Sequence, residues 1–76
     1  MTIYDVIRVM DDAFIIVFGS HDNELFHFWS QDYFELQDYF ELPEHKRKMI
    51  TDRKITWIER TDKGLDIYIE DEKSGE

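Results

Sequence analysis

Two apolar runs rich in β-branched and aromatic residues open the chain, residues 3–10 (IYDVIRVM) and 13–18 (AFIIVF). Only Asp11 and Asp12 separate them, and two such runs joined by a tight acidic turn are typical of a β-hairpin. The first run also has the apolar spacing of a short helix, but its valine and isoleucine content and the adjacent turn favour a strand. After a polar loop, residues 24–29 (ELFHFW) alternate as a third strand. This part of the chain therefore predicts a three-stranded meander.

One hexapeptide occurs twice in residues 31–42 (QDYFELQDYFEL), directly before Pro43. As a strand, both faces would mix acids or amides with rings, so neither could pack cleanly. As a helix, most rings and leucines gather on one side, and only Phe34 and Leu42 fall off that side. Ser30 stands where an N-cap belongs, and Pro43 disfavours helical geometry at Leu42. The repeat therefore predicts a helix whose other side carries a line of acids, here called the acidic ridge: Asp32, Glu35, Asp38 and Glu41.

The last third of the chain predicts a second, shorter helix starting at Pro43, followed by a β-hairpin. Residues 54–60 (KITWIER) and 65–70 (LDIYIE) flank the turn sequence TDKG. Alternation places Ile55 and Trp57 on one face of the first of these strands.

Together these elements predict a single α+β domain over residues 1–70, built on a small antiparallel sheet. The expected order is strand, strand, strand, helix, short second helix, strand, strand, and residues 71–76 are expected to form a polar, frayed tail. A chain of 76 residues leaves little room for a second domain and buries only about 60% of its unfolded surface. Its twelve aromatic residues are hard to hide in one small core. Some rings are therefore expected on the surface, and a homodimer would relieve the shortage of core.

Charge is distributed unevenly along the chain. Eighteen acids against nine bases give a formal net charge of −9, with −9 in residues 1–44, +4 in residues 45–63 and −4 in residues 64–76. Such asymmetry bears on solubility and partners rather than on fold. The basic segment has Trp57 nearby, as in a nucleic-acid site, but a body at −9 repels a polyanion, so no direct contact with nucleic acid is expected. Whether residues 46–54 pair with the protein's own acids or touch an acidic partner is left open.

No motif for catalysis, metal binding or a cofactor stands out. His21, His27 and His45 lack metal-ligand spacing, and the sequence around His21 lacks the oxygen pattern of a calcium loop. No serine sits in a nucleophile elbow, and the three glycines form no phosphate-binding loop. We expect a protein that is not an enzyme and has no catalytic, metal or cofactor site.

The chain has no cysteine and no visible N-terminal signal, and its longest apolar run, residues 13–18, is far too short to cross a bilayer. These features predict a soluble, cytoplasmic domain with no membrane association.

The acidic ridge suggests a function. Acids three residues apart on a helix rise about 4.5 Å per step, and duplex DNA carries about one charge per 1.7 Å of axis, so the ridge could loosely occupy a groove built for phosphates. Further acids could extend this field and two rings could add apolar contacts: Asp11, Asp12, Asp22, Glu24, Phe34 and Tyr39. The plain alternative is an amphipathic helix whose solvated side happens to be acidic.

A very short, cysteine-free, aromatic-rich chain with acids concentrated in QDYFELQDYFELPE resembles the small acidic bacteriophage proteins that disable host factors. Some of those proteins are DNA mimics that occupy the nucleic-acid sites of histone-like nucleoid proteins or of defence and repair enzymes; others block a host enzyme by ordinary contact. The resemblance rests on size and composition across the whole chain and transfers no residue role. It implies a DNA-mimic inhibitor acting in the host cytoplasm on a basic DNA-binding protein. The alternative is an inhibitor or adaptor that binds a host metabolic enzyme through exposed rings such as Phe34 or Tyr68.

Overall fold

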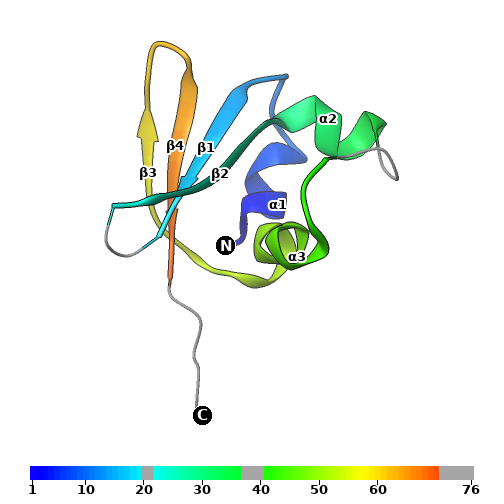
Figure 1. Cartoon of the computed structure of the whole chain (residues 1–76). Helices are drawn as coiled ribbons and strands as arrows, with labels where there is room; N and C mark the ends of the chain where they lie inside the picture. The colour runs from blue at the N-terminus through cyan, green and yellow to red at the C-terminus, as the bar shows by residue number, and fades with distance from the viewer. Residues whose placement is uncertain (20–21, 37–40, 71–76) are drawn as a thin grey trace.

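A four-stranded sheet with helices against one side forms the body of the molecule (Figure 1). The computed structural model describes residues 1–19, 22–36 and 41–70. In chain order, the elements are α1 (Ile3–Ile7), β1 (Phe14–Phe18), β2 (Glu24–Trp29), α2 (Ser30–Glu35), α3 (Glu44–Asp52), β3 (Ile55–Arg60) and β4 (Gly64–Ile69). The predicted α+β class is confirmed. The expected tail at residues 71–76 lies outside the described residues.

The strands lie in the order β2-β1-β4-β3. The pairs β1–β2 and β3–β4 are antiparallel, which confirms the C-terminal hairpin and the strand at residues 24–29. The two hairpins meet through β1 and β4, which run parallel, so the prediction of a wholly antiparallel sheet is wrong at its centre. Parallel neighbours need a long crossover, and here the segment containing α2, α3 and β3 provides it.

The strand predicted at residues 3–10 is wrong, because α1 occupies residues 3–7. A capping box begins this helix: the Thr2 hydroxyl accepts the Asp5 N–H at 3.4 Å, and the Asp5 carboxylate accepts the Thr2 N–H at 3.0 Å. Ile3 and Ile7, one turn apart, are both buried. A capped N-terminus and an apolar pair at helical spacing outweigh the β propensity of the run. The first hairpin predicted from the sequence therefore does not form.

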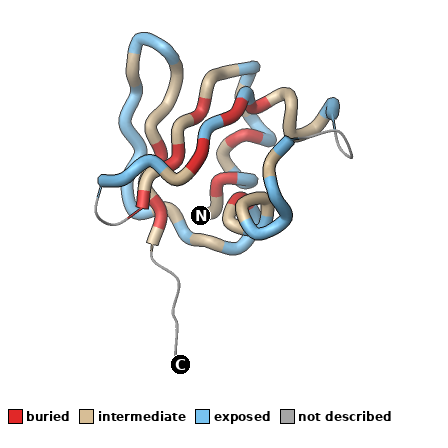
Figure 2. The backbone as a smooth tube through the Cα atoms, viewed as in Figure 1, coloured by how far each residue is buried: buried red, intermediate tan, exposed pale blue. Residues whose placement is uncertain are grey.

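The hydrophobic core lies between the sheet and the helices α1 and α3, as the buried segments in Figure 2 show. Among the residues that the structure describes, its buried side chains are nine: Ile3, Ile7, Ile15, Val17, Phe26, Phe28, Ile50, Ile67 and Ile69. In β1 and β2, buried residues alternate with more exposed ones, so only one side of the sheet faces the helices.

Edge strand β3 is the most exposed part of the sheet. A bulge shifts its register between Ile55 and Trp57, so that Ile55 lies opposite Ile69 and Trp57 opposite Tyr68. The prediction that Ile55 and Trp57 share a face is therefore wrong, because the extra residue reverses the alternation between them.

The helix predicted over residues 31–42 is also wrong in its extent. Helix α2 ends at Glu35, and Glu41 and Leu42 lie outside any helix. Phe34 and Leu42, the two residues that a straight helix would place off its apolar side, both pack against the core. A single straight helix over the repeat could not bury Phe34 and Leu42 together with the rest of its apolar side, and this accounts for the end of α2 at Glu35.

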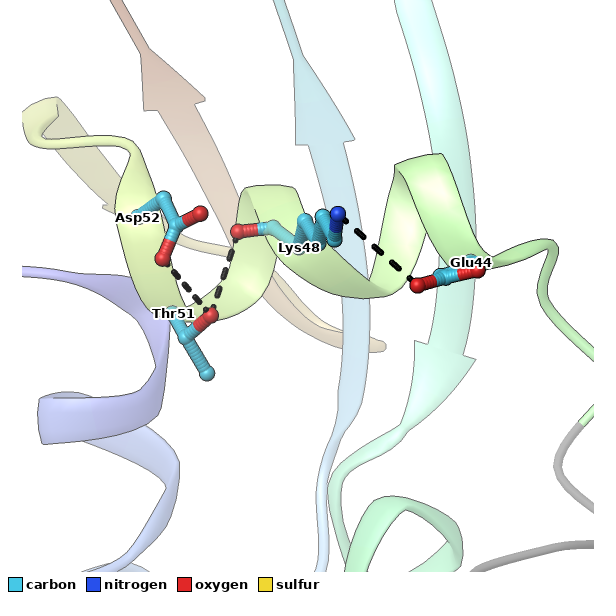
Figure 3. Close-up of polar contacts among 4 residues, drawn as sticks. All are labelled: Glu44, Lys48, Thr51 and Asp52. Atoms are coloured by element: carbon cyan, nitrogen blue, oxygen red, sulfur yellow. Dashed lines mark hydrogen bonds and ion pairs between the residues drawn. The ribbon is translucent and has the colours of Figure 1, made fainter.

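The second predicted helix is confirmed as α3, with Pro43 at its N-cap position, one residue before the helix rather than within it. Polar contacts run along its exposed side (Figure 3): the Lys48 ammonium lies 3.7 Å from the Glu44 carboxylate. The Thr51 hydroxyl has two acceptors within reach of its one proton, the Lys48 carbonyl at 3.2 Å and the Asp52 carboxylate at 3.0 Å. No helix within the described residues is both long enough and apolar enough to span a membrane.

Candidate functional site

A groove of about 690 Å³ runs beside the edge strand β2 and is the candidate functional site, here called the β2 groove. Every residue of β2 lines it, and α2, the segment before α3, and α3 itself form its other wall. The lining residues are Phe14, Glu24, Leu25, Phe26, His27, Phe28, Trp29, Asp32, Leu36, Glu41, Leu42 and Lys46. Among the described lining residues, three carboxylates and one ammonium group therefore share this groove.

Each of the three groove acids is positioned by a different part of the chain. Glu24 opens β2, and Asp32 lies in the first turn of α2, next to the positive end of that short helix. Glu41 directly precedes Leu42, whose side chain packs against the core and so fixes this part of the wall. The acids converge because strand, helix and connecting segment fold around the same space.

Asp11 and Asp12 lie at the end of the molecule where α2 begins. The Asp12 carboxylate accepts the Gln31 N–H at 3.2 Å, and the Ser30 hydroxyl lies 3.4 Å from the same oxygen. Ser30 was predicted to be the N-cap of the helix, but it is the first helical residue, and Trp29 holds the N-cap position without a side-chain bond. An aspartate from a distant loop thus supplies the cap. Asp12 has a structural role next to the β2 groove.

The remaining predicted site residues are dispersed. Asp22 lies in the β1–β2 turn, at the opposite end of β1 from Asp12, with a left-handed φ of 59°. Glu35 is exposed at the end of α2. Phe34 is half-buried, with its ring centroid 5.2 Å from that of Tyr33, so it belongs to the core rather than to an exposed interface. Asp38 and Tyr39 lie outside the described residues.

The acidic ridge is therefore not the continuous helical line that the repeat predicts. Of its members, Asp32 and Glu35 share α2, whereas Glu41 follows the helix and faces the β2 groove. Two members of the predicted ridge, Asp32 and Glu41, instead line the β2 groove together with Glu24.

Among the described residues, two close contacts involve the groove acids and the acids of α3. Between described residues, the Glu24 carboxylate lies 3.6 Å from the His27 imidazole, and Glu44 forms an ion pair with Lys48. The Arg53 guanidinium donates to the Glu70 carbonyl at 3.3 Å. Both contacts are solvent-exposed, so they contribute little to stability and leave the Glu24 and Glu44 carboxylates available to a partner.

The side of the sheet opposite the helices forms a second surface, the helix-free face. By alternation and register it consists of Phe14, Ile16, Phe18, His27, Trp29, Trp57, Glu59, Asp66 and Tyr68. Its rings contact one another across strands: the Phe18 and Tyr68 rings stack at 4.9 Å, and Phe14 and Trp29 lie 5.3 Å apart. Trp57 is 62% exposed and Trp29 48% exposed. The described residues of this face include acids and rings but no lysine or arginine.

Tyr68 shows the electrostatic character of this face. Desolvation raises the pKa of the Tyr68 hydroxyl above its usual value, and the nearby carboxylates of Asp22, Asp66 and Glu59 raise it further. Glu59 and Asp66 are directly paired across β3 and β4, an arrangement of like charges that is unfavourable unless a cation approaches. The helix-free face is thus negative as well as aromatic.

Within residues 1–19, 22–36 and 41–70, no three histidine, aspartate or glutamate side chains gather as ligands for a metal ion. Comparison of the chain with protein-family models, curated proteins and solved structures gave no match. Function is therefore inferred from the residues and geometry of the chain itself.

Sequence reasoning missed several residues of the β2 groove, namely His27, Trp29, Leu36 and Lys46. The strand alternation of residues 24–29 does place His27 and Trp29 on the outer side of the sheet. Leu36 and Lys46 come from segments that only tertiary packing brings beside β2, so no local pattern could have found them.

Proposed function

We propose that this protein is a non-enzymatic, acidic binding protein that inhibits a basic DNA-binding protein by occupying its DNA site. The observation that carries the proposal is the convergence of Glu24, Asp32 and Glu41 on one groove, where Lys46 is the only lysine or arginine among the described lining residues. Negative groups held at the rim of a groove attract a cationic partner and steer its approach. The resemblance to bacteriophage inhibitors adds host nucleoid, defence and repair proteins as the class of partner.

The experiment compares capture of partners from a bacterial lysate at low and high salt, using two variants with equal loss of charge. The groove variant carries Glu24→Gln, Asp32→Asn and Glu41→Gln. The control variant carries substitutions at three acids that do not line the groove: Asp52→Asn, Asp62→Asn and Glu70→Gln. Surface charges are screened over about 8 Å at physiological salt, so a partner held by charge is released as salt rises.

The expected partner is a basic DNA-binding protein that duplex DNA displaces from the captured complex. The groove variant should bind it at least about tenfold more weakly than the control variant. Equal binding by the two variants, or a partner that DNA does not displace, would refute the proposal.

The exposed rings of the helix-free face favour a second candidate, a protein that binds a metabolic enzyme by apolar contact. Buried aromatic residues usually dominate such interfaces, so this binding should resist salt and be lost in Trp57→Ala. A neutral enzyme retained at high salt and lost only with Trp57→Ala would decide for this candidate. The first candidate is predicted to act as a homodimer, and the oligomeric state in solution tests that prediction.

A further inference from the structure

The β2 groove is bounded on one side by the outer edge of the sheet, and this edge has a definable hydrogen-bonding pattern. The Ser30 N–H donates to the Ala13 carbonyl at 2.9 Å, continuing the register in which Phe14 faces Trp29. Because bonded and non-bonded pairs alternate in an antiparallel ladder, Phe28 and Phe26 bond to β1, whereas His27 and Trp29 do not. The N–H and C=O of His27 and the N–H of Trp29 therefore point away from β1, toward the side of the groove.

The two edges of the sheet differ in how well they are protected. Edge strand β3 carries a bulge, its first residue Ile55 donates its N–H to the Met1 carbonyl at 2.8 Å, and Arg60 stands exposed on it. Bulges, exposed charges and covering segments are the devices by which proteins block further strand pairing. The register of β2 also shifts, between Phe26 and Glu24, but its segment from Phe26 to Trp29 is regular and contains no proline, lysine or arginine. It is the less protected edge, and it faces a groove rather than flat solvent.

We infer that β2 is a strand-addition site, at which an extended, basic segment of the partner protein pairs as a fifth strand. This inference rests on the proposed function and adds the form in which the partner binds. Backbone groups of His27 and Trp29 supply the pairing, which gives affinity without regard to sequence. The groove carboxylates select lysine or arginine at some positions of the segment, and Trp29, Leu36 and Leu42 accept apolar side chains at others.

The direct test uses the full chain labelled with ¹⁵N and a short peptide of alternating lysine and valine as the probe. Amide hydrogen exchange reports which backbone groups become bonded. Binding of the probe should slow exchange at His27 and Trp29 without changing Ile58 and Arg60, the outward-pointing residues of β3. A peptide of alternating glutamate and valine should bind at least about tenfold more weakly.

A matched pair of variants separates backbone pairing from charge. Both His27→Pro and His27→Thr remove the imidazole; only His27→Pro also removes the outward-pointing N–H, at a position where edge strands tolerate proline. Both should retain the sheet, as judged by their thermal unfolding. His27→Pro should bind the lysine–valine probe about tenfold or more weakly than His27→Thr.

Several results would overturn the inference: no protection at His27 and Trp29, protection at Ile58 and Arg60 instead, or equal binding by the two His27 variants. Protection at His27 that rises with protein concentration in the absence of probe would assign this edge to a second copy of the chain. A lysate partner that is lost with the groove variant but kept by His27→Pro would overturn strand addition and leave the proposed function intact.

Discussion

Replacing Ser30 with alanine should destabilise the protein by an amount that follows from one buried hydroxyl. Ser30 is fully buried, and its side-chain oxygen accepts the Ala13 N–H at 2.9 Å. Removing that acceptor leaves a partly buried backbone donor unpaired, which costs about 1–3 kcal/mol. Alanine is a better helix former than serine by a few tenths of a kcal/mol, which offsets a small part of this loss. For a domain of this size, each kcal/mol lowers Tm by about 4–8 °C.

The assay is thermal and urea unfolding of Ser30→Ala followed by circular dichroism, with Thr51→Ala as the control. The Thr51 hydroxyl also makes hydrogen bonds, but it is exposed on α3, so its removal should change stability by no more than about 0.5 kcal/mol. A loss below about 0.5 kcal/mol in Ser30→Ala, or equal losses in the two variants, would refute the account of Ser30 as the link between the α1–β1 connection and α2.

Three further outcomes are expected. Gly64→Ala should lower the free energy of unfolding in urea by at least about 1–3 kcal/mol, because φ is +155° and a Cβ would overlap the backbone of β1. In the control Gly19→Ala, the new Cβ meets mainly movable side-chain atoms, so comparable losses in the two variants would contradict this prediction. The hydrogen bond from the Thr2 N–H holds the pKa of Asp5 below its ordinary value of 3.8, so its stabilising contribution is present above about pH 4 and is lost as pH falls; Asp5→Asn should flatten the dependence of Tm on acid pH. The pKa of Tyr68 is raised above its ordinary value of 10.0, so the contribution of the protonated Tyr68 hydroxyl to the free energy of unfolding is present below about pH 10 and is lost as pH rises. Tyr68→Phe should therefore remove one late-titrating phenolate from the ultraviolet absorbance titration.

Local sequence pattern was sufficient where an element's neighbours in space are also its neighbours in sequence. The β3–β4 hairpin has two alternating strands and a turn that ends in glycine, and all three signals agree. The local signals disagree in residues 3–7: isoleucine and valine favour a strand, whereas the Thr2–Asp5 capping box and the spacing of Ile3 and Ile7 favour a helix. The capping box was a readable signal, and weighing it against β propensity would have corrected the prediction.

Other features depend on tertiary packing and could not be read locally. The parallel pairing of β1 with β4 joins distant segments, and no short-range pattern specifies it. The break after α2 follows from burying both Phe34 and Leu42, a demand visible only once the core exists. The candidate site has the same origin, since Asp32 and Glu41 were predicted on one continuous helix, whereas tertiary packing makes both of them line the β2 groove.

The parallel contact between β1 and β4 also has a consequence for how the molecule assembles. Phe14 pairs with Gly64, a separation of 50 residues, whereas each hairpin is closed by a short turn. Each hairpin can form independently within microseconds, but pairing β1 with β4 requires closing a loop that contains most of the chain. A nascent polypeptide therefore cannot complete its sheet until residues 64–69 have been made. Cleavage before Gly64 would remove the strand that holds the two halves together, not a dispensable edge.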